Sequence, residues 1–173
     1  AKITVTAPRV AFASLDRAEL AYVYKDHGVG YFSGSFTHFI TLRLSAMDAY
    51  SFFCPWMMAN DIGAYVPVRD LAGGMLVLYL KKYASFGTVI EIAAGVTTGT
   101  STGLGAEITL SLDTTYYLKI VRDESVGAFG TFYLYVYSDA ARTVLVGSSE
   151  REILEWKDWR YLYPLAGAGF DST

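Results

Sequence analysis

The sequence is poor in cysteine, histidine, proline and charged residues. One of its 173 residues is a cysteine, two are histidines, four are prolines, and 18% are charged. The single cysteine, Cys54, excludes a disulfide within the chain, and its neighbours Phe53 and Pro55 favour a buried thiol. Neither His27 nor His38 has a partner at the spacing of a zinc site. The scattered basic residues and the net charge of −3 argue against nucleic-acid binding through a basic surface.

The sequence also lacks an apolar run long enough to span a membrane. Its longest such tracts are MLVLYL (75–80) and FFCPWMMA (52–59), and both fall well short of the ~20 residues that a transmembrane helix needs. The opening residues, AKITVTAPRV, lack the charged-then-apolar pattern of a signal peptide. We therefore expect no membrane insertion.

Aromatic residues are abundant, with 14 tyrosines and 10 phenylalanines, and such residues favour β-strands. Segments with alternating side-chain character recur along the chain, each bounded by Gly, Asp, Ser or Thr: residues 3–7, 18–26, 35–44, 74–83, 87–95, 106–112, 116–123, 131–139 and 142–147. Their short links predict antiparallel hairpins. We therefore predict a single all-β domain over residues 1–173, an antiparallel β-sandwich of two packed sheets.

One stretch has a helical pattern, SSEREILEWKDW (148–159). Ser149 and Glu152 have the spacing of a capping box, and the apolar residues that follow would form a stripe. The sequence therefore predicts at most one short helix, near residues 149–158. An irregular strand is the alternative.

The segment TFYLYVYSD (131–139) places a tyrosine at every second position. Because successive side chains of a strand point to opposite faces, Tyr133, Tyr135 and Tyr137 share one face of the sheet. The neighbouring segment YYLKIVRD would add Tyr117, Lys119 and Val121 to that face, or instead Tyr116, Leu118 and Ile120. We expect the first register, because the aliphatic residues of the second belong in the core. The same reasoning adds Tyr79 from LVLYLKK.

The order of four segments resembles the concanavalin A-like lectin/glucanase superfamily, including its laminin-G-like jelly rolls. The segments are TTYYLKIVRD (114–123), GTFYLYVYSDAARTVLV (130–146), FSGSFTHFITLRLSA (32–46) and DWRYLYPLAG (158–167). The resemblance covers about residues 20–167 and implies a jelly-roll sandwich. Its members include lectins, carbohydrate-binding modules, glycosidases, adhesion modules, and phage or metagenomic surface proteins. It implies an extracellular or virion-surface location, and phage structural proteins reach the outside without a signal peptide.

The glucanase branch of this superfamily carries a Glu-x-Asp-x-Glu or Glu-x-Asp-x-x-Glu strand, because retaining hydrolysis needs two carboxylates about 5 Å apart. This sequence contains no such spacing. The acidic residues of SEREILE (149–155) lack the central Asp, and Glu91 and Glu107 sit singly on their predicted strands. We therefore expect a protein that is not an enzyme. Carboxylates distant in sequence but close in space would give the alternative, a glycoside-active enzyme.

We expect no cofactor, with calcium as the open alternative. Calcium accepts oxygen ligands from loops, and three acidic residues in turn-like segments are candidate ligands: Asp26, Asp61 and Asp70. The superfamily resemblance is what brings calcium into consideration. Such a site requires two acidic loops that lie close in space.

These observations lead to the interpretation of a non-catalytic carbohydrate-binding domain. A concave aromatic sheet face and its adjoining loops would recognise a glycan, since sugar rings stack on aromatic side chains while polar groups pair with the hydroxyls. Trp56, beside Pro55 and two methionines, would be a further anchor if exposed and part of the core if buried.

The rival interpretation is a structural or adhesion module of a phage fibre or capsid-decoration protein. In it, the aromatic and methionine-rich surface would meet a protein partner or the rest of a larger virion or multidomain protein. The tyrosines would then only pack the sheet, because cross-strand aromatic pairs stabilise it by about 0.2–1 kcal/mol without any ligand.

Overall fold

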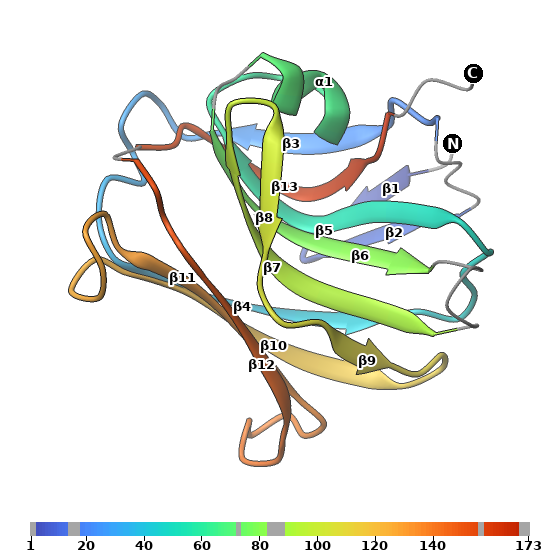
Figure 1. Ribbon diagram of the computed structural model, residues 1–173. Coiled ribbons are helices and arrows are strands. Elements are labelled where there is room, and N and C mark those ends of the chain that lie inside the picture. Colours follow the sequence, from blue (N-terminus) through green and yellow to red (C-terminus); the bar gives the residue numbers. More distant parts are fainter. Residues whose placement is uncertain (1–2, 14–17, 72–73, 83–88, 156–157, 170–173) are drawn as a thin grey trace.

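The structure is a computed structural model that describes residues 3–13, 18–71, 74–82, 89–155 and 158–169 (Figure 1). Its main body is a β-sandwich of two antiparallel sheets. The four-stranded sheet has the order β12 (Leu145–Glu152), β11 (Thr131–Tyr137), β10 (Thr115–Asp123) and β4 (Phe36–Arg43). The predicted all-β sandwich is therefore confirmed.

The larger sheet has seven strands. Its order is β3 (Tyr22–Asp26), β13 (Tyr161–Gly167), β5 (Ser51–Ala59), β6 (Met75–Lys82), β7 (Ile90–Thr98) and β8 (Ser101–Leu104), while β9 (Ile108–Leu110) also pairs with β7. A separate hairpin, β1 (Ile3–Thr6) and β2 (Arg9–Phe12), packs on the sandwich through Phe12, whose ring meets that of Phe53 edge-on at 4.8 Å.

The core lies between the two sheets, and strict alternation along β10 and β11 supplies one half of it. Five apolar side chains from these two strands are completely buried: Leu118, Ile120, Phe132, Leu134 and Val136. The larger sheet contributes Trp56, which stacks on Phe132 at 5.5 Å between ring centroids. The Trp56 indole N–H donates to Nδ1 of His38 at 3.2 Å, so this histidine of β4 is hydrogen-bonded across the core. Burial lowers the pKa of His38 and favours its neutral form.

Strand β5 is buried on both faces, which explains its continuous apolar sequence. Its second face belongs to another cluster, where α1 (Tyr65–Asp70) covers the far side of the larger sheet (Figure 1). Cys54 is completely buried there, and burial raises the pKa of its thiol, as expected for an inert residue. Pro55 is accommodated by a shift in the β5–β6 register between Phe53 and Trp56.

The helix predicted near residues 149–158 is wrong for the part that the structure describes. Ser149 to Glu152 belong to β12 and pair with β11, and the Ser149 hydroxyl accepts the N–H of Ala94 in the opposite sheet instead of capping a helix. Residues 156–157 of that prediction lie outside the described residues. The helix that does form, α1, contains Pro67 in its first turn, where a missing N–H costs no intrahelical bond. Within the described ranges, no helix has the length and apolarity needed to cross a membrane.

This packing predicts the effect of truncating a core residue of β11. Leu134→Ala should lower the free energy of unfolding by about 2–5 kcal/mol, because it removes a completely buried side chain and leaves a cavity. Thr41→Ala, on the exposed side of the same sheet, should change stability by about 0.5 kcal/mol or less. Urea denaturation measures both variants. Equal losses of stability in the two variants would contradict the assignment of Leu134 to the core face and of Thr41 to the exposed face.

Candidate functional site

The four-stranded sheet has a second face that points away from the core, and we call it the outer face. Cross-strand pairing sets Tyr117 opposite Tyr137, Lys119 opposite Tyr135, and Val121 opposite Tyr133. The flanking strands extend this surface on both sides, with Thr41, Phe39 and Thr37 from β4, and Ser148 and Glu150 from β12. The observed register is the one that the sequence favoured, and it brings five of the predicted binding residues onto one surface.

The aromatic rings of the outer face lie against one another. Tyr133 and Tyr135 are stacked, with ring centroids 6.0 Å apart and planes inclined by 13°. The Lys119 Nζ lies 5.7 Å from the Tyr135 ring centroid. Partial burial, followed by the proximity of Tyr133 and Tyr137, raises the pKa of Tyr135 and keeps its hydroxyl protonated at neutral pH.

The polar groups of these side chains are available to a ligand. Across the described residues, the hydroxyls of Tyr117, Tyr133, Tyr135 and Tyr137 have no hydrogen-bond partner in the protein, and the Lys119 ammonium has no ion pair. The rings themselves are half-buried by their neighbours. The outer face therefore combines ordered ring surfaces with unpaired donors and acceptors.

Two hairpins stand at opposite ends of the four-stranded sheet (Figure 1). In the β11–β12 hairpin, the Asp139 carboxylate accepts the backbone N–H groups of Thr143 at 2.9 Å and Val144 at 2.7 Å. This hairpin places the Arg142 guanidinium 4.5 Å from the Phe39 ring centroid and 6.0 Å from that of Tyr117. Arg142 thus reaches across the sheet to its far strand.

At the other end, the outer face continues into an open depression of about 400 Å³. It is lined by Ser35, Phe36, Thr37, Val121, Arg122 and Asp123. The depression adjoins Tyr133, whose cross-strand neighbour is Val121. Hydroxyl and carboxylate groups therefore border the aromatic surface at this end.

Two of the predicted binding residues lie elsewhere: the assignment of Tyr79 to this surface is wrong, and Trp56, predicted as a separate anchor if exposed, is buried. Tyr79 belongs to β6 in the larger sheet, where its ring stacks on Phe52 at 3.9 Å and meets Tyr65 at 5.8 Å. Trp56 is 2% exposed and lies between the sheets, so it is a core residue and not a ligand anchor. Both residues lie on strands that are covered on both faces, β6 for Tyr79 and β5 for Trp56. The apolar sequences of these strands therefore do not indicate which side chains face solvent.

The structure brings together two carboxylates that the sequence showed as isolated. Lys81 of β6 forms ion pairs with Glu107 and with Glu91 of β7, the latter at 3.6 Å. Burial and the neighbouring Glu107 raise the pKa of Glu91. The contact depends on the pairing of β7 with β9, which no local pattern in the sequence indicates. The lysine between the two carboxylates makes this an ion-pair triad.

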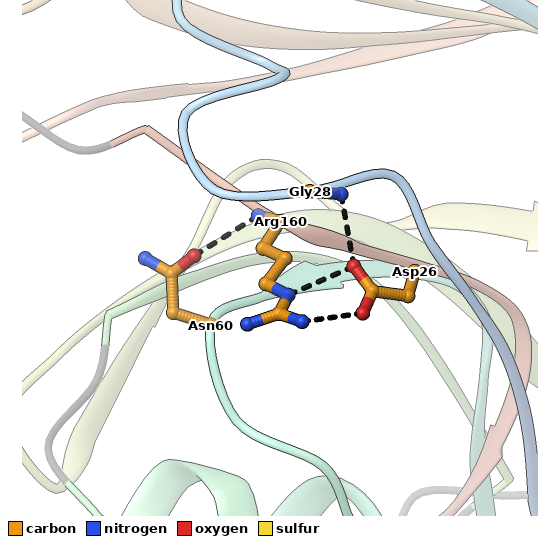
Figure 2. A network of polar contacts seen from close by, with 4 residues as sticks. All are labelled: Asp26, Gly28, Asn60 and Arg160. Atoms are coloured by element: carbon orange, nitrogen blue, oxygen red, sulfur yellow. Dashed lines mark hydrogen bonds and ion pairs between the residues drawn. The ribbon is translucent and has the colours of Figure 1, made fainter.

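A second polar network ties together the ends of β3, β5 and β13 (Figure 2). The Asp26 carboxylate accepts Nε of Arg160 at 2.8 Å, Nη2 of Arg160 at 2.5 Å and the N–H of Gly28 at 2.8 Å. The backbone N–H of Arg160 in turn donates to Oδ1 of Asn60 at 2.9 Å. These bonds lower the pKa of Asp26 to about 2, with the Arg160 contact the largest cause.

The three calcium candidates do not form a common site. Asp26 is held by Arg160, Asp70 pairs with Arg69 at 2.8 Å, and Asp61 contributes its backbone carbonyl to the Tyr163 hydroxyl at 2.6 Å. In the ranges that the structure describes, no three side chains of His, Cys, Asp or Glu gather closely enough to hold a metal ion. The two neighbouring acidic loops that a calcium site requires are therefore not found there.

Comparisons with known proteins leave the outer face as the main guide to function. No protein-family model, curated protein or solved structure matches this chain.

The Asp26–Arg160 pair predicts a specific dependence of stability on pH. Because the pKa of Asp26 is about 2 in the folded protein and 3.8 ordinarily, the pair stabilises the fold above pH 3.8, and this contribution is lost as the pH falls through 2. Asp26→Asn should therefore lower the Tm at neutral pH, and its difference from the unmodified protein should shrink between about pH 4 and pH 2.

Thermal unfolding followed by circular dichroism at several pH values measures this difference. Asp48→Asn is the matched control, because in the described structure the Asp48 side chain makes no hydrogen bond or ion pair. A Tm difference for Asp26→Asn that does not vary with pH would contradict the assigned role of the carboxylate.

Proposed function

We propose that this protein is a non-catalytic carbohydrate-binding domain that holds a glycan on the outer face. The observation that carries the proposal is the set of four tyrosines, Tyr117, Tyr133, Tyr135 and Tyr137, with unpaired hydroxyls among the described residues. They come from two adjacent strands at paired positions. The partner is a polysaccharide or another glycan.

The chemistry of this surface suits a sugar better than a purely apolar ligand. The C–H faces of a pyranose stack on aromatic rings, and its hydroxyls must be paired again after they lose water. Phenol hydroxyls, the Lys119 ammonium and the Glu150 carboxylate supply those partners beside the rings. A surface without such groups would leave sugar hydroxyls unsatisfied, at a cost in affinity.

The arrangement of the sheets supports a jelly roll of the concanavalin A-like kind, which we propose as the fold family. The segment YLYPLAG is β13, and it lies between β3, from the start of the chain, and β5. Within the described residues, β13 therefore lies inside the larger sheet, and β3 forms its edge. In this proposal the domain acts outside the cell or on a virion surface, where polysaccharides are accessible.

One observation favours a second function, a structural or adhesion module of a phage fibre or capsid-decoration protein. Val144, Leu145 and Val146 are 56%, 53% and 43% exposed at the edge of the four-stranded sheet, on β12 and the residue before it. An exposed apolar edge strand is suited to pairing with another protein chain. In this second reading, the tyrosines stabilise the sheet and bind nothing.

The glycan proposal predicts that removing the stacked pair abolishes most of the binding. On a glycan array and a panel of insoluble polysaccharides, Tyr133→Ala/Tyr135→Ala should bind at least about tenfold more weakly than the unmodified protein, a loss of about 1.4 kcal/mol or more. Circular dichroism of the variant establishes that the sheet remains folded.

Tyr50→Ala is the matched control, because Tyr50 is exposed in the turn before β5 and lies off the outer face. It should bind as the unmodified protein does. Equal binding by the double variant and the control would contradict the proposed site. If no glycan is bound and the protein elutes as an oligomer, the structural module is favoured instead.

A further inference from the structure

We infer that the glycan carries a carboxylate group, held between Lys119 at the centre of the outer face and Arg142 of the β11–β12 hairpin. This inference rests on the proposed function and adds the charge and orientation of the ligand. The expected ligand is a saccharide that ends in an acidic sugar of the uronic-acid type, and not a neutral saccharide.

Lys119 lies at the centre of the outer face among uncharged neighbours. Its cross-strand partners are Phe39 on β4 and Tyr135 on β11, and the nearest residues on its own side of β10 are Tyr117 and Val121. No carboxylate occupies any of these positions. The ammonium charge therefore has no carboxylate at its adjoining positions on a partly apolar surface, where an anionic group would gain more than it would in bulk water.

Arg142 approaches the same place from the hairpin. Its guanidinium lies over Phe39 and Tyr117, which are two of the immediate neighbours of Lys119. In the part of the chain that the structure describes, the Arg142 side chain donates one hydrogen bond, from Nη1 to the Ala140 carbonyl at 3.4 Å. Its buried Nε has no hydrogen-bond partner there. Arg142 therefore lies over two rings that adjoin Lys119, while the Lys119 ammonium itself lies near the ring of Tyr135.

This arrangement differs from that of five other basic residues in the described part of the chain. These five form ion pairs with carboxylates: Arg43, Arg69, Lys81, Arg122 and Arg160. Lys119 and Arg142 both adjoin Phe39 and Tyr117, and like charges without a counter-ion are unfavourable, so an anion from outside would complete this part of the outer face. A guanidinium with free N–H groups matches the planar fork of a carboxylate.

The opposite end of the outer face carries the other sign of charge. Glu150 pairs across the strands with Tyr133, Glu152 pairs with Thr131, and Asp123 lies in the wall of the depression. A saccharide with an acidic group on every ring would be repelled there. The charge distribution therefore orients the ligand, with its acidic ring at Arg142 and neutral rings over Tyr135 and Tyr133.

Matched oligosaccharides test this inference directly. The probes share one neutral backbone and end in a neutral sugar, in glucuronic acid, or in a sulfated sugar. Isothermal titration should show the glucuronate-terminated probe binding at least about tenfold more tightly than the neutral one, a preference that shrinks as salt rises from about 0.05 to about 0.5 M. The sulfated probe should show a smaller gain in affinity over the neutral probe, because a sulfate lacks the planar fork of a carboxylate.

Two variants should abolish the preference, so that each binds the glucuronate-terminated probe no more tightly than the neutral probe. They are Lys119→Gln and Arg142→Asn, and asparagine suits position 142 because its φ of 57° lies in the left-handed region. Lys119→Arg should keep the preference. Lys25→Gln is the matched control, since it removes the same charge from β3 in the other sheet and should change nothing.

The outcomes separate this inference from the proposed function. Equal binding of the neutral and glucuronate-terminated probes, with loss in Tyr133→Ala/Tyr135→Ala, overturns the acidic ligand and keeps the carbohydrate site. An equal or larger gain for the sulfated probe overturns the choice of a carboxylate. Absence of binding to all three probes overturns the acidic ligand, and the glycan array then decides the proposed function. If Lys119→Gln and Arg142→Asn both still prefer the glucuronate-terminated probe to the neutral one, the inference is also overturned.

Discussion

The packing of one face of β10 and β11 against the larger sheet determines what the other face presents. Leu118, Leu134 and Val136 are completely buried, and Phe132 stacks on Trp56. A slip of one residue in either strand would expose these side chains and bury tyrosine hydroxyls and a lysine without partners. Hydrophobic burial therefore fixes the register, and the register sets the tyrosines side by side. The proposed site is a consequence of the core on its reverse side.

Different parts of the site depend on different kinds of structure. The tyrosines and Lys119 stand on paired strands, so their spacing is set before any ligand arrives. Arg142 stands on a hairpin that the Asp139 carboxylate closes through backbone N–H groups, which lowers the pKa of that carboxyl. A ligand that meets such a surface orders few new side chains, which reduces the entropy cost of binding. Rigidity here comes from the sheet and from one capped turn.

The sequence predicted the parts of the structure that depend on local alternation. The sandwich, the tyrosine face and its register with Tyr117 and Lys119 all follow from side chains that alternate between core and solvent. Tyr79 and Trp56 were misplaced because β5 and β6 are covered on both sides, so alternation carries no information there. Ser149 and Glu152 have helical spacing, but pairing with β11 overrides it. The Lys81 triad depends on strand pairing between distant segments, which no local pattern encodes.

Tyrosine-ring NMR spectra give the most direct test of a ligand site on the outer face. Protein labelled at its tyrosine rings is titrated with the glucuronate-terminated oligosaccharide, and each ring signal is assigned by single substitution. The account predicts that the signals of Tyr117, Tyr133, Tyr135 and Tyr137 shift together, while those of Tyr65, Tyr161 and Tyr163 in the other half of the molecule stay in place. Shifts confined to this second group, or no shift in any ring, would contradict it.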